Sequence, residues 1–366
     1  MLSLLLLLMG AGILLSFSAS PPVAKRLGID AFHFVTRHLI FMVPALIVMI
    51  GVSFLNLRQV RRLSLLMLIA ALIAMALIPF IGFSAKGATR WISIASFSLQ
   101  PSEFLKPAFV VITAWLFAEN SRQPDIPCNL IAVVLFGICA GLLVMQPDLG
   151  QTVLLAAVWG SMFFLAGMPW LWIAILGGAA VFGLGLAYLS FSHFSGRIDR
   201  FLTGTGDTFQ VDRGLMAINN GGWFGSGPGE GRIKNGLPDS HTDFIFSVAA
   251  EEFGILVTMG VVLVFAAIVL RGLSKSMSEK DRFVQLAVAG LVLQFGFQAI
   301  INIGVNLQLL PAKGMTLPFV SYGGSSLLAI AFGMGLVLAL TRRRAEHYSR
   351  VDTLLKPGRV SALGAA

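Results

Sequence analysis

The sequence predicts an all-α, polytopic integral membrane protein with about ten transmembrane helices and a large extracytoplasmic loop between helices 7 and 8. Of its 366 residues, 57% are hydrophobic and only 12% are charged, whereas about 25% of the residues in a typical globular domain are charged. The apolar residues recur in blocks of roughly 15–25 residues, each long enough to cross about 30 Å of hydrocarbon as a helix. This repetition excludes a soluble domain carried on a single membrane anchor.

The expected helices follow one another along the chain up to residue 341. They cover approximately residues 1–18, 38–56, 63–83, 104–118, 129–145, 152–167, 170–191, 244–270, 284–307 and 323–341. The first block resembles a secretory signal in the small residues that follow it, but no Lys or Arg precedes it, which favours a retained helix.

An even number of spans places both ends of the chain on the same side of the membrane. The basic run Arg342–Arg344 predicts that this side is the cytoplasm, because cytoplasmic loops are enriched in Lys and Arg. The chain therefore divides into a transmembrane domain, residues 1–341, and a cytoplasmic C-terminal tail, residues 342–366. The long polar segment 192–242 then lies outside the cell.

The net charge of +9 does not indicate a nucleic-acid partner. Its basic residues stand in short polar stretches beside apolar blocks, as at 58–62, and form no basic stripe on a soluble face. Anionic lipid headgroups explain this distribution better. The two cysteines, Cys128 and Cys139, are about 16 Å apart along one expected helix, too far for a disulfide.

The glycine-rich centre of the long loop, residues 221–231, resembles a phosphate-cradling loop only superficially. It has no strand–turn–helix context and no Gly-Lys-Ser/Thr ending, so it does not predict a nucleotide site. Its glycines favour a flexible loop in which two backbone segments approach closely.

Charged residues at membrane depth are expensive and are candidates for function. Glu103 and Lys106 stand three residues apart at the mouth of the fourth span and share a helix face. The alternative is an ion pair that only stabilises the helix end. Asp148 lies in the tight turn 146–151, where it could instead cap the sixth helix.

A third group of charges begins at Asp243. One straight helix from Asp243 to Leu270 would be about 41 Å long and would hold Asp243 at the outer headgroup level. Glu251 and Glu252 then lie near the top of the hydrocarbon, and helical spacing lets at most one of them share a cavity with Asp243. The alternative for Asp243 is an N-cap, which Thr242 could equally supply.

A carboxylate at headgroup height near outer-loop cations suits a substrate that is itself an anionic lipid with a polar head. The carboxylate could act as a general base, and the cations could stabilise a departing pyrophosphate. The same residues could bind a headgroup for transport, so the residues alone favour an enzyme without excluding a transporter.

Several motifs, in order and over nearly the whole chain, resemble the SEDS family, whose members include FtsW, RodA and SpoVE. They are Gly87–Ile92, Phe97–Lys106, Gln146–Gly150, Pro238–Phe246, Glu251–Gly254 and Leu317–Ser326. Within the family, the loop Pro311–Pro318 resembles that of the division branch, FtsW. After Leu202 the chain departs from the usual family pattern, so contacts from that stretch are not carried over.

The resemblance implies a peptidoglycan glycosyltransferase of the bacterial cytoplasmic (inner) membrane that polymerises lipid II at the division septum. It implies a class B penicillin-binding transpeptidase and other divisome membrane proteins as partners. The family's essential aspartate falls on Asp243, which would take the proton from the acceptor hydroxyl during an inverting attack on the donor. The alternatives are a lipid II flippase, a RodA-type elongation polymerase and a non-catalytic scaffold.

The candidate substrate-binding residues combine the charged groups above with positions that match family motifs. They are Arg90, Gln100, Ser102, Glu103, Lys106, Asp148, Arg197, Lys234, His241, Glu251, Lys313 and Ser321. Pyrophosphate contacts are expected from the cations Arg197, Arg200, Lys234 and Lys313. No set of metal ligands is assigned, although a divalent cation, Mg²⁺ or Mn²⁺, could share the work of stabilising pyrophosphate.

Overall fold

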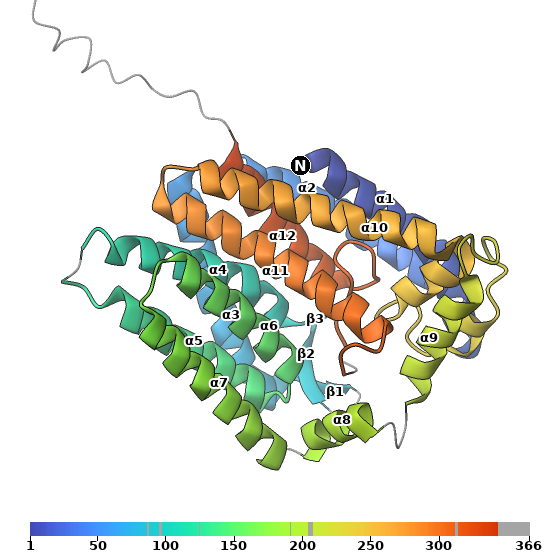
Figure 1. Cartoon of the computed structure of the whole chain (residues 1–366). Helices are drawn as coiled ribbons and strands as arrows, with labels where there is room; N and C mark the ends of the chain where they lie inside the picture. The colour runs from blue at the N-terminus through green and yellow to red at the C-terminus, as the bar shows by residue number, and fades with distance from the viewer. Residues whose placement is uncertain are drawn as a thin grey trace, which may run out of the picture.

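A computed structural model describes residues 1–85, 88–94, 97–123, 125–190, 192–203, 208–311 and 314–342. Long helices lie side by side over most of the chain, with one small sheet at one end of the bundle (Figure 1). The helices that coincide with the expected apolar blocks are α1 (Leu2–Arg26), α2 (His33–Ser53), α3 (Leu57–Ile81), α4 (Pro101–Asn120), α5 (Cys128–Met145), α6 (Leu149–Leu165), α7 (Trp170–Ser190), α10 (Ile245–Ser278), α11 (Arg282–Asn306) and α12 (Gly324–Thr341). The all-α membrane class is confirmed.

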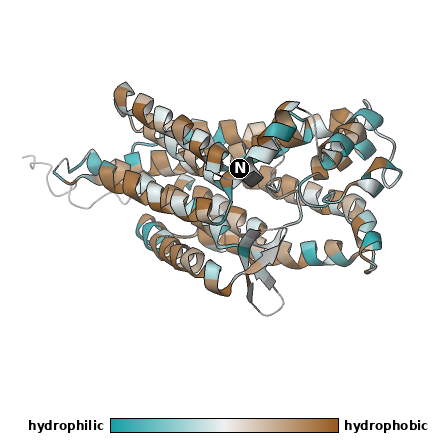
Figure 2. Ribbon diagram, turned by 90° about the horizontal axis from the view of Figure 1, so that it is seen from below, coloured by the Kyte–Doolittle hydropathy of each residue, from teal (hydrophilic) through white to brown (hydrophobic). Residues whose placement is uncertain are grey.

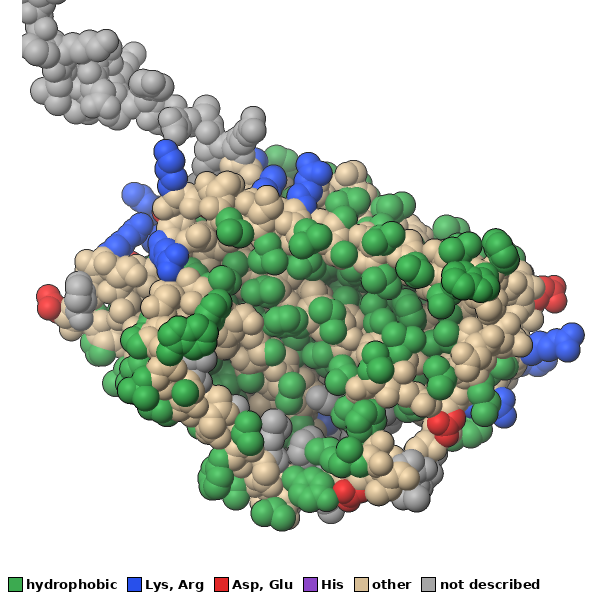
Figure 3. Space-filling view, viewed as in Figure 1, with side chains coloured by type: hydrophobic (Ala, Val, Ile, Leu, Met, Phe, Trp, Pro, Cys, Tyr) green, Lys and Arg blue, Asp and Glu red, His purple; other side chains and the backbone are tan. Residues whose placement is uncertain are grey.

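Eight of the helices within the described ranges are long and apolar enough to cross a membrane. The other two expected spans are α6, which has 17 residues, and α4, which carries Glu103 and Lys106 in its first two turns. The number of spans therefore stays a prediction. In Figure 3, hydrophobic side chains cover the middle of the face shown, and Lys and Arg gather toward the end where α12 finishes. Further Lys and Arg side chains lie at the opposite end of this face, and the orientation stays a prediction.

The helices α11 and α12 form the centre of the bundle, with 72% and 78% of their apolar stretches buried. Gly335 lets α12 approach α2 closely, because a Cβ there would lie 2.8 Å from the Met49 carbonyl oxygen. By contrast, α7 buries none of its described residues. Apolar residues run along the helices, as Figure 2 shows, and those that face outward suit contact with lipid.

A small antiparallel sheet between α3 and α4 was not expected from the sequence. Its strands, in the order β1–β2–β3, are β1 (Phe83–Ala85), β2 (Ala88–Ile94) and β3 (Phe97–Leu99). Strands of three to seven residues carry too little alternation to be recognised from pattern alone. The sheet places Arg90, in β2, at the same end of the bundle as the start of α4.

The prediction of one straight helix from Asp243 to Leu270 is wrong. Helix α10 begins at Ile245 and is broken at Gly254, whose φ of 78° and ψ of 174° are not helical. The glycine-rich hairpin at 222–227 supplies hydrogen bonds in place of those that the break removes. The carbonyls of Glu251 and Glu252 accept from Ser226 and Gly227, and the amide of Ile255 donates to Gly222.

The predicted extracytoplasmic loop, residues 192–242, is largely helical where it is described. It contains α8 (Ser192–Thr203), α9 (Phe209–Gly221) and the 3₁₀ turn η1 (Ile233–Gly236). Helix α9 packs on α10 at the end where α10 begins (Figure 1). The close backbone approach predicted for the glycine-rich centre is confirmed, because a Cβ on Gly221 would overlap the backbone of Ala250.

Candidate functional site

Glu103 and Lys106 form a buried ion pair at the start of α4. Pro101 occupies the first turn of the helix, where its missing amide hydrogen costs nothing. The Lys106 Nζ lies 2.9 Å from Glu103 Oε2, and the two side chains are only 2% and 5% exposed. The ion pair that the sequence allowed is therefore present, and its depth means that each charge depends on its neighbours for stabilisation.

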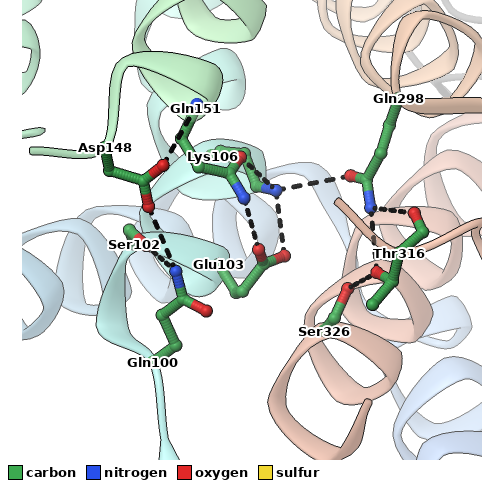
Figure 4. A network of polar contacts seen from close by, with 9 residues as sticks. All are labelled: Gln100, Ser102, Glu103, Lys106, Asp148, Gln151, Gln298, Thr316 and Ser326. Carbon is green, nitrogen blue, oxygen red and sulfur yellow. Dashed lines mark hydrogen bonds and ion pairs between the residues drawn. The ribbon is translucent and has the colours of Figure 1, made fainter. Parts of the chain in front are cut away.

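Two glutamines from other helices complete this pair, as Figure 4 shows. Gln151 of α6 donates to Glu103 Oε1 at 2.7 Å and accepts from Lys106 Nζ at 2.8 Å. Gln298 of α11 accepts from Lys106 Nζ at 3.3 Å. We call Glu103, Lys106, Gln151 and Gln298 the buried polar cluster. It joins three helices around one ammonium group.

The turn before α6 lies beside the cluster and is held by Asp148. Its carboxylate accepts from the backbone amide of Gln151 at 3.4 Å, which confirms the N-cap that the sequence allowed. It also accepts from Gln100 Nε2 at 3.3 Å. Arg90 lies 3.5 Å from the same carboxylate and donates to the carbonyls of Gln146 and Pro147. Burial raises the pKa of the Asp148 carboxyl, and the Arg90 charge opposes that shift. Three predicted residues thus meet at this turn, and Ser102 joins them by accepting from Gln100 at 3.1 Å.

Asp243 is half-buried at the end of the long loop, just before α10. Phe244 holds the N-cap position of α10, so neither Thr242 nor Asp243 fulfils the capping role that was the alternative. The Asp243 amide donates to the Asp239 carbonyl at 3.1 Å, while its carbonyl accepts from Asn302 and Asn306 of α11, both at 2.9 Å. The backbone of Asp243 is therefore held on both sides.

The segment 314–318 connects Asp243 to the buried polar cluster. Gln298 donates to the Thr316 carbonyl at 3.1 Å, and the Thr316 hydroxyl lies 2.8 Å from that of Ser326 (Figure 4). One residue earlier, the Met315 carbonyl accepts from Asn302 at 2.6 Å. Lys106 is thus linked to Asp243 in three steps. Gln298 bonds both Lys106 and Thr316, the chain runs from Thr316 to Met315, and Asn302 donates to the carbonyls of Met315 and Asp243.

Lys234 and Glu251 lie in a different cluster, where loop and helix are fastened together. Glu251 is fully buried and accepts from the amides of Ile233 and Lys234, at 2.7 and 2.9 Å. The Lys234 ammonium contacts Glu252 and donates to the Ser18 carbonyl of α1 at 3.1 Å. This arrangement gives both predicted residues a role in holding the long loop on α1 and α10.

His241 and Ser321 lie where the turn that carries Asp243 meets the segment before α12. The His241 ring lies 4.4 Å from the Phe34 ring and 5.5 Å from that of Tyr322, and its carbonyl accepts from the Tyr322 amide at 3.0 Å. Ser321 accepts from the Leu317 amide at 2.8 Å. His241 therefore links the turn that carries Asp243 to Tyr322, and Ser321 holds the turn that begins at Leu317.

The remaining predicted residues are placed only in part. Arg197 belongs to α8, but its side chain lies outside what the structure describes, as does Lys313 as a whole. Arg200 donates to the Gly196 carbonyl within α8 at 2.7 Å. Among the described residues, no three His, Cys, Asp or Glu side chains gather in a way that could hold a metal ion. Cys128 and Cys139 are free and buried.

Sequence reasoning missed Gln151, Gln298, Asn302 and Asn306 as site residues. Three of them, Gln298, Asn302 and Asn306, recur every four residues within an otherwise apolar block. Such spacing places side-chain amides on one face of a helix. Polar groups at that depth are expensive unless they are paired, so this periodicity was a usable signal.

Most of the chain is similar to known proteins. A family model described as "Cell cycle protein" and covering FtsW, RodA and SpoVE matches residues 1–346. A protein of Caulobacter vibrioides named probable peptidoglycan glycosyltransferase FtsW is 48% identical over 93% of this chain and 88% of its own length. A protein of the same name from Pseudoalteromonas translucida is 35% identical over 91% and 86%.

Two solved structures share the fold. One is a chain of a peptidoglycan synthase complex, described for its structural coordination of polymerization and crosslinking. It has a TM-score of 0.75 and 25% identity, over 92% of this chain and 96% of that one. The other is the rod shape determining protein RodA of Thermus thermophilus, with a TM-score of 0.67 and 26% identity over 92% and 95%.

Proposed function

Because the chain belongs to the FtsW/RodA/SpoVE family of cell cycle proteins, we propose that it is a peptidoglycan glycosyltransferase that polymerises lipid II. The relatives at 48% and 35% identity carry that activity in their names. The protein is a multi-pass membrane protein, and we place its reaction at the outer face of the bacterial cytoplasmic membrane. The name FtsW of these relatives supports a role in building the division septum.

The observation that carries the mechanism is the setting of Asp243. The residue is half-buried, its backbone is fixed by Asn302 and Asn306, and a Cβ on Gly314 would lie 3.4 Å from its Oδ2. A carboxylate held in this way suits a general base. Asp243 takes the proton of the acceptor sugar hydroxyl as that oxygen attacks the donor's anomeric carbon. The bond to undecaprenyl pyrophosphate breaks with inversion, and the pyrophosphate leaves with the electron pair.

The departing pyrophosphate requires positive charge near Asp243. Arg90 is a candidate for this role because 21% of its side chain is exposed, whereas the Lys106 ammonium is buried among three partners. Arg197 and Lys313 are further candidates. A divalent cation, Mg²⁺ or Mn²⁺, could share this charge, although no group of three or more His, Cys, Asp or Glu among the described residues could hold one.

The partner we propose is a class B penicillin-binding transpeptidase. The support is the similarity to a chain from a complex that coordinates polymerization and crosslinking. Other divisome membrane proteins would place the pair at the septum. Purification of the protein from dividing cells under mild detergent should recover the transpeptidase.

Lipid II incorporated into vesicles with the purified complex tests the proposal against its main rival, a flippase. A polymerase extends glycan strands, which gel electrophoresis resolves, and Asp243→Asn abolishes them. Headgroup translocation without strand formation, unaffected by Asp243→Asn, would instead support transport. Strand formation that depends on Asp243, with no translocation, supports the polymerase.

A further inference from the structure

We propose that the side-chain amides of Gln298, Asn302 and Asn306 are positioning residues that fix Asp243 and the segment 314–316 relative to each other. The three residues are four apart on α11 and therefore lie on one face of the helix. We call them the amide row. The inference rests on the proposed function of Asp243 as the group that takes the proton.

Each amide of the row donates to a backbone carbonyl outside the helices. Gln298 donates to Thr316 at 3.1 Å, and Asn302 donates both to Met315 at 2.6 Å and to Asp243 at 2.9 Å. Asn306 donates to the same Asp243 carbonyl at 2.9 Å. Asn302 is thus the member that holds both segments at once.

The row is anchored at its far end as well. The Asn306 side-chain oxygen accepts from the Ser247 hydroxyl at 2.7 Å and from the Ser247 amide at 3.2 Å, which fixes the first turn of α10. The three side chains are at most 2% exposed, so water cannot replace them. A buried carbonyl left without a donor costs about 1–3 kcal/mol, and the two segments would shift to avoid that cost.

Side-chain amides suit these three positions because the neighbouring backbone carbonyls need hydrogen-bond donors. Residues 239–244 and 314–318 are not regular helix, so their carbonyls need donors from elsewhere, and lipid supplies none. Helix α11 is central and largely buried, which makes it a rigid frame for both segments. The result is a fixed distance between the Asp243 carboxylate and Gly314, where a Cβ would lie 3.4 Å from Oδ2.

The test is lipid II polymerisation by the full-length protein in complex with its transpeptidase, comparing wild type with Asn302→Leu. Leucine keeps the size and removes the donor, so kcat should fall on the order of 100-fold, because a misplacement of about 1 Å can cost that much. KM should change less than about threefold, because the substrate contacts stay. The matched control is Gln294→Leu, about two turns before Asn302 on α11 and also buried, which should behave as wild type.

Asn302→Gln guards against a variant that fails to fold. It keeps an amide but moves it by one methylene, so melting in detergent should stay near the wild-type value while kcat still falls. Wild-type kcat in either Asn302 variant, or a rise in KM with kcat unchanged, would overturn the positioning role. Asp243→Asn is measured alongside. If it is inactive while both Asn302 variants are normal, only this inference fails, and if it is active, the proposed function of Asp243 fails.

Discussion

The backbone of Gly314 lies against the carboxylate of Asp243, close enough that a Cβ on Gly314 would be 3.4 Å from Asp243 Oδ2. Alanine would make an ordinary contact there, whereas the branched side chain of valine would occupy the space that an acceptor hydroxyl needs. We expect Gly314→Ala to retain polymerisation and Gly314→Val to lose on the order of 100-fold in kcat/KM. Equal activity of the two variants would show that this space is not used.

The buried polar cluster predicts an asymmetric response to mutation. Lys106→Met leaves the Glu103 carboxylate buried without its cation and should destabilise the protein by about 3–5 kcal/mol. The double variant Glu103→Gln/Lys106→Met removes both charges and should recover much of that loss, because the side-chain amide introduced at position 103 can still accept from Gln151. Thermal unfolding in detergent measures both. A double variant less stable than Lys106→Met would contradict the pairing.

The break in α10 predicts a contrast between two glycines of the same helix. Gly254 has a φ of 78°, and a Cβ there would overlap the hairpin backbone at Trp223–Gly225, so Gly254→Ala should cost about 3 kcal/mol. Gly260 has open space around its Cβ position, and Gly260→Ala should stabilise the helix by about 0.5–1 kcal/mol. Unfolding temperatures of the two variants in the same detergent provide the comparison.

Mutation of Lys234 tests whether this residue stabilises the fold or binds the substrate. Its ammonium is bound to Glu252 and to the Ser18 carbonyl, so Lys234→Met should lower the unfolding temperature and make the long loop more sensitive to protease. The KM for lipid II should stay within about threefold of wild type, because the substitution removes no contact with the substrate. A large rise in KM with unchanged stability would instead make Lys234 a pyrophosphate contact, as the sequence suggested.

Much of the fold was predictable because a membrane imposes one simple pattern. Uninterrupted apolar blocks fixed the positions of the long helices, and the charges within them pointed to Glu103, Lys106, Asp148 and Asp243. The N-cap at Asp148 and the ion pair at Lys106 also followed from local spacing. In each case the signal and its structural consequence lie within a few residues of each other.

What the sequence did not predict depends on contacts between distant segments. The break at Gly254 exists because a hairpin from the preceding loop supplies its hydrogen bonds, and periodicity along α10 contains no trace of that partner. The structural role of Lys234 was also missed. Its ion pair with Glu252 and its hydrogen bond to Ser18 form only when η1 packs against α10 and α1. The small sheet between α3 and α4 was missed because its strands are short.

The most direct test of the central claim is the time course of glycan strand formation from purified lipid II by the complex with its transpeptidase. Wild type is compared with Asp243→Asn and with Asp30→Asn, which removes a charge from an exposed aspartate whose side chain accepts from the Phe32 backbone amide. A general base typically contributes 10²–10⁴-fold, so Asp243→Asn should lose at least about 100-fold in rate while remaining folded and bound to the partner. Asp30→Asn should keep the wild-type rate. Strand formation by Asp243→Asn at the wild-type rate would contradict the account.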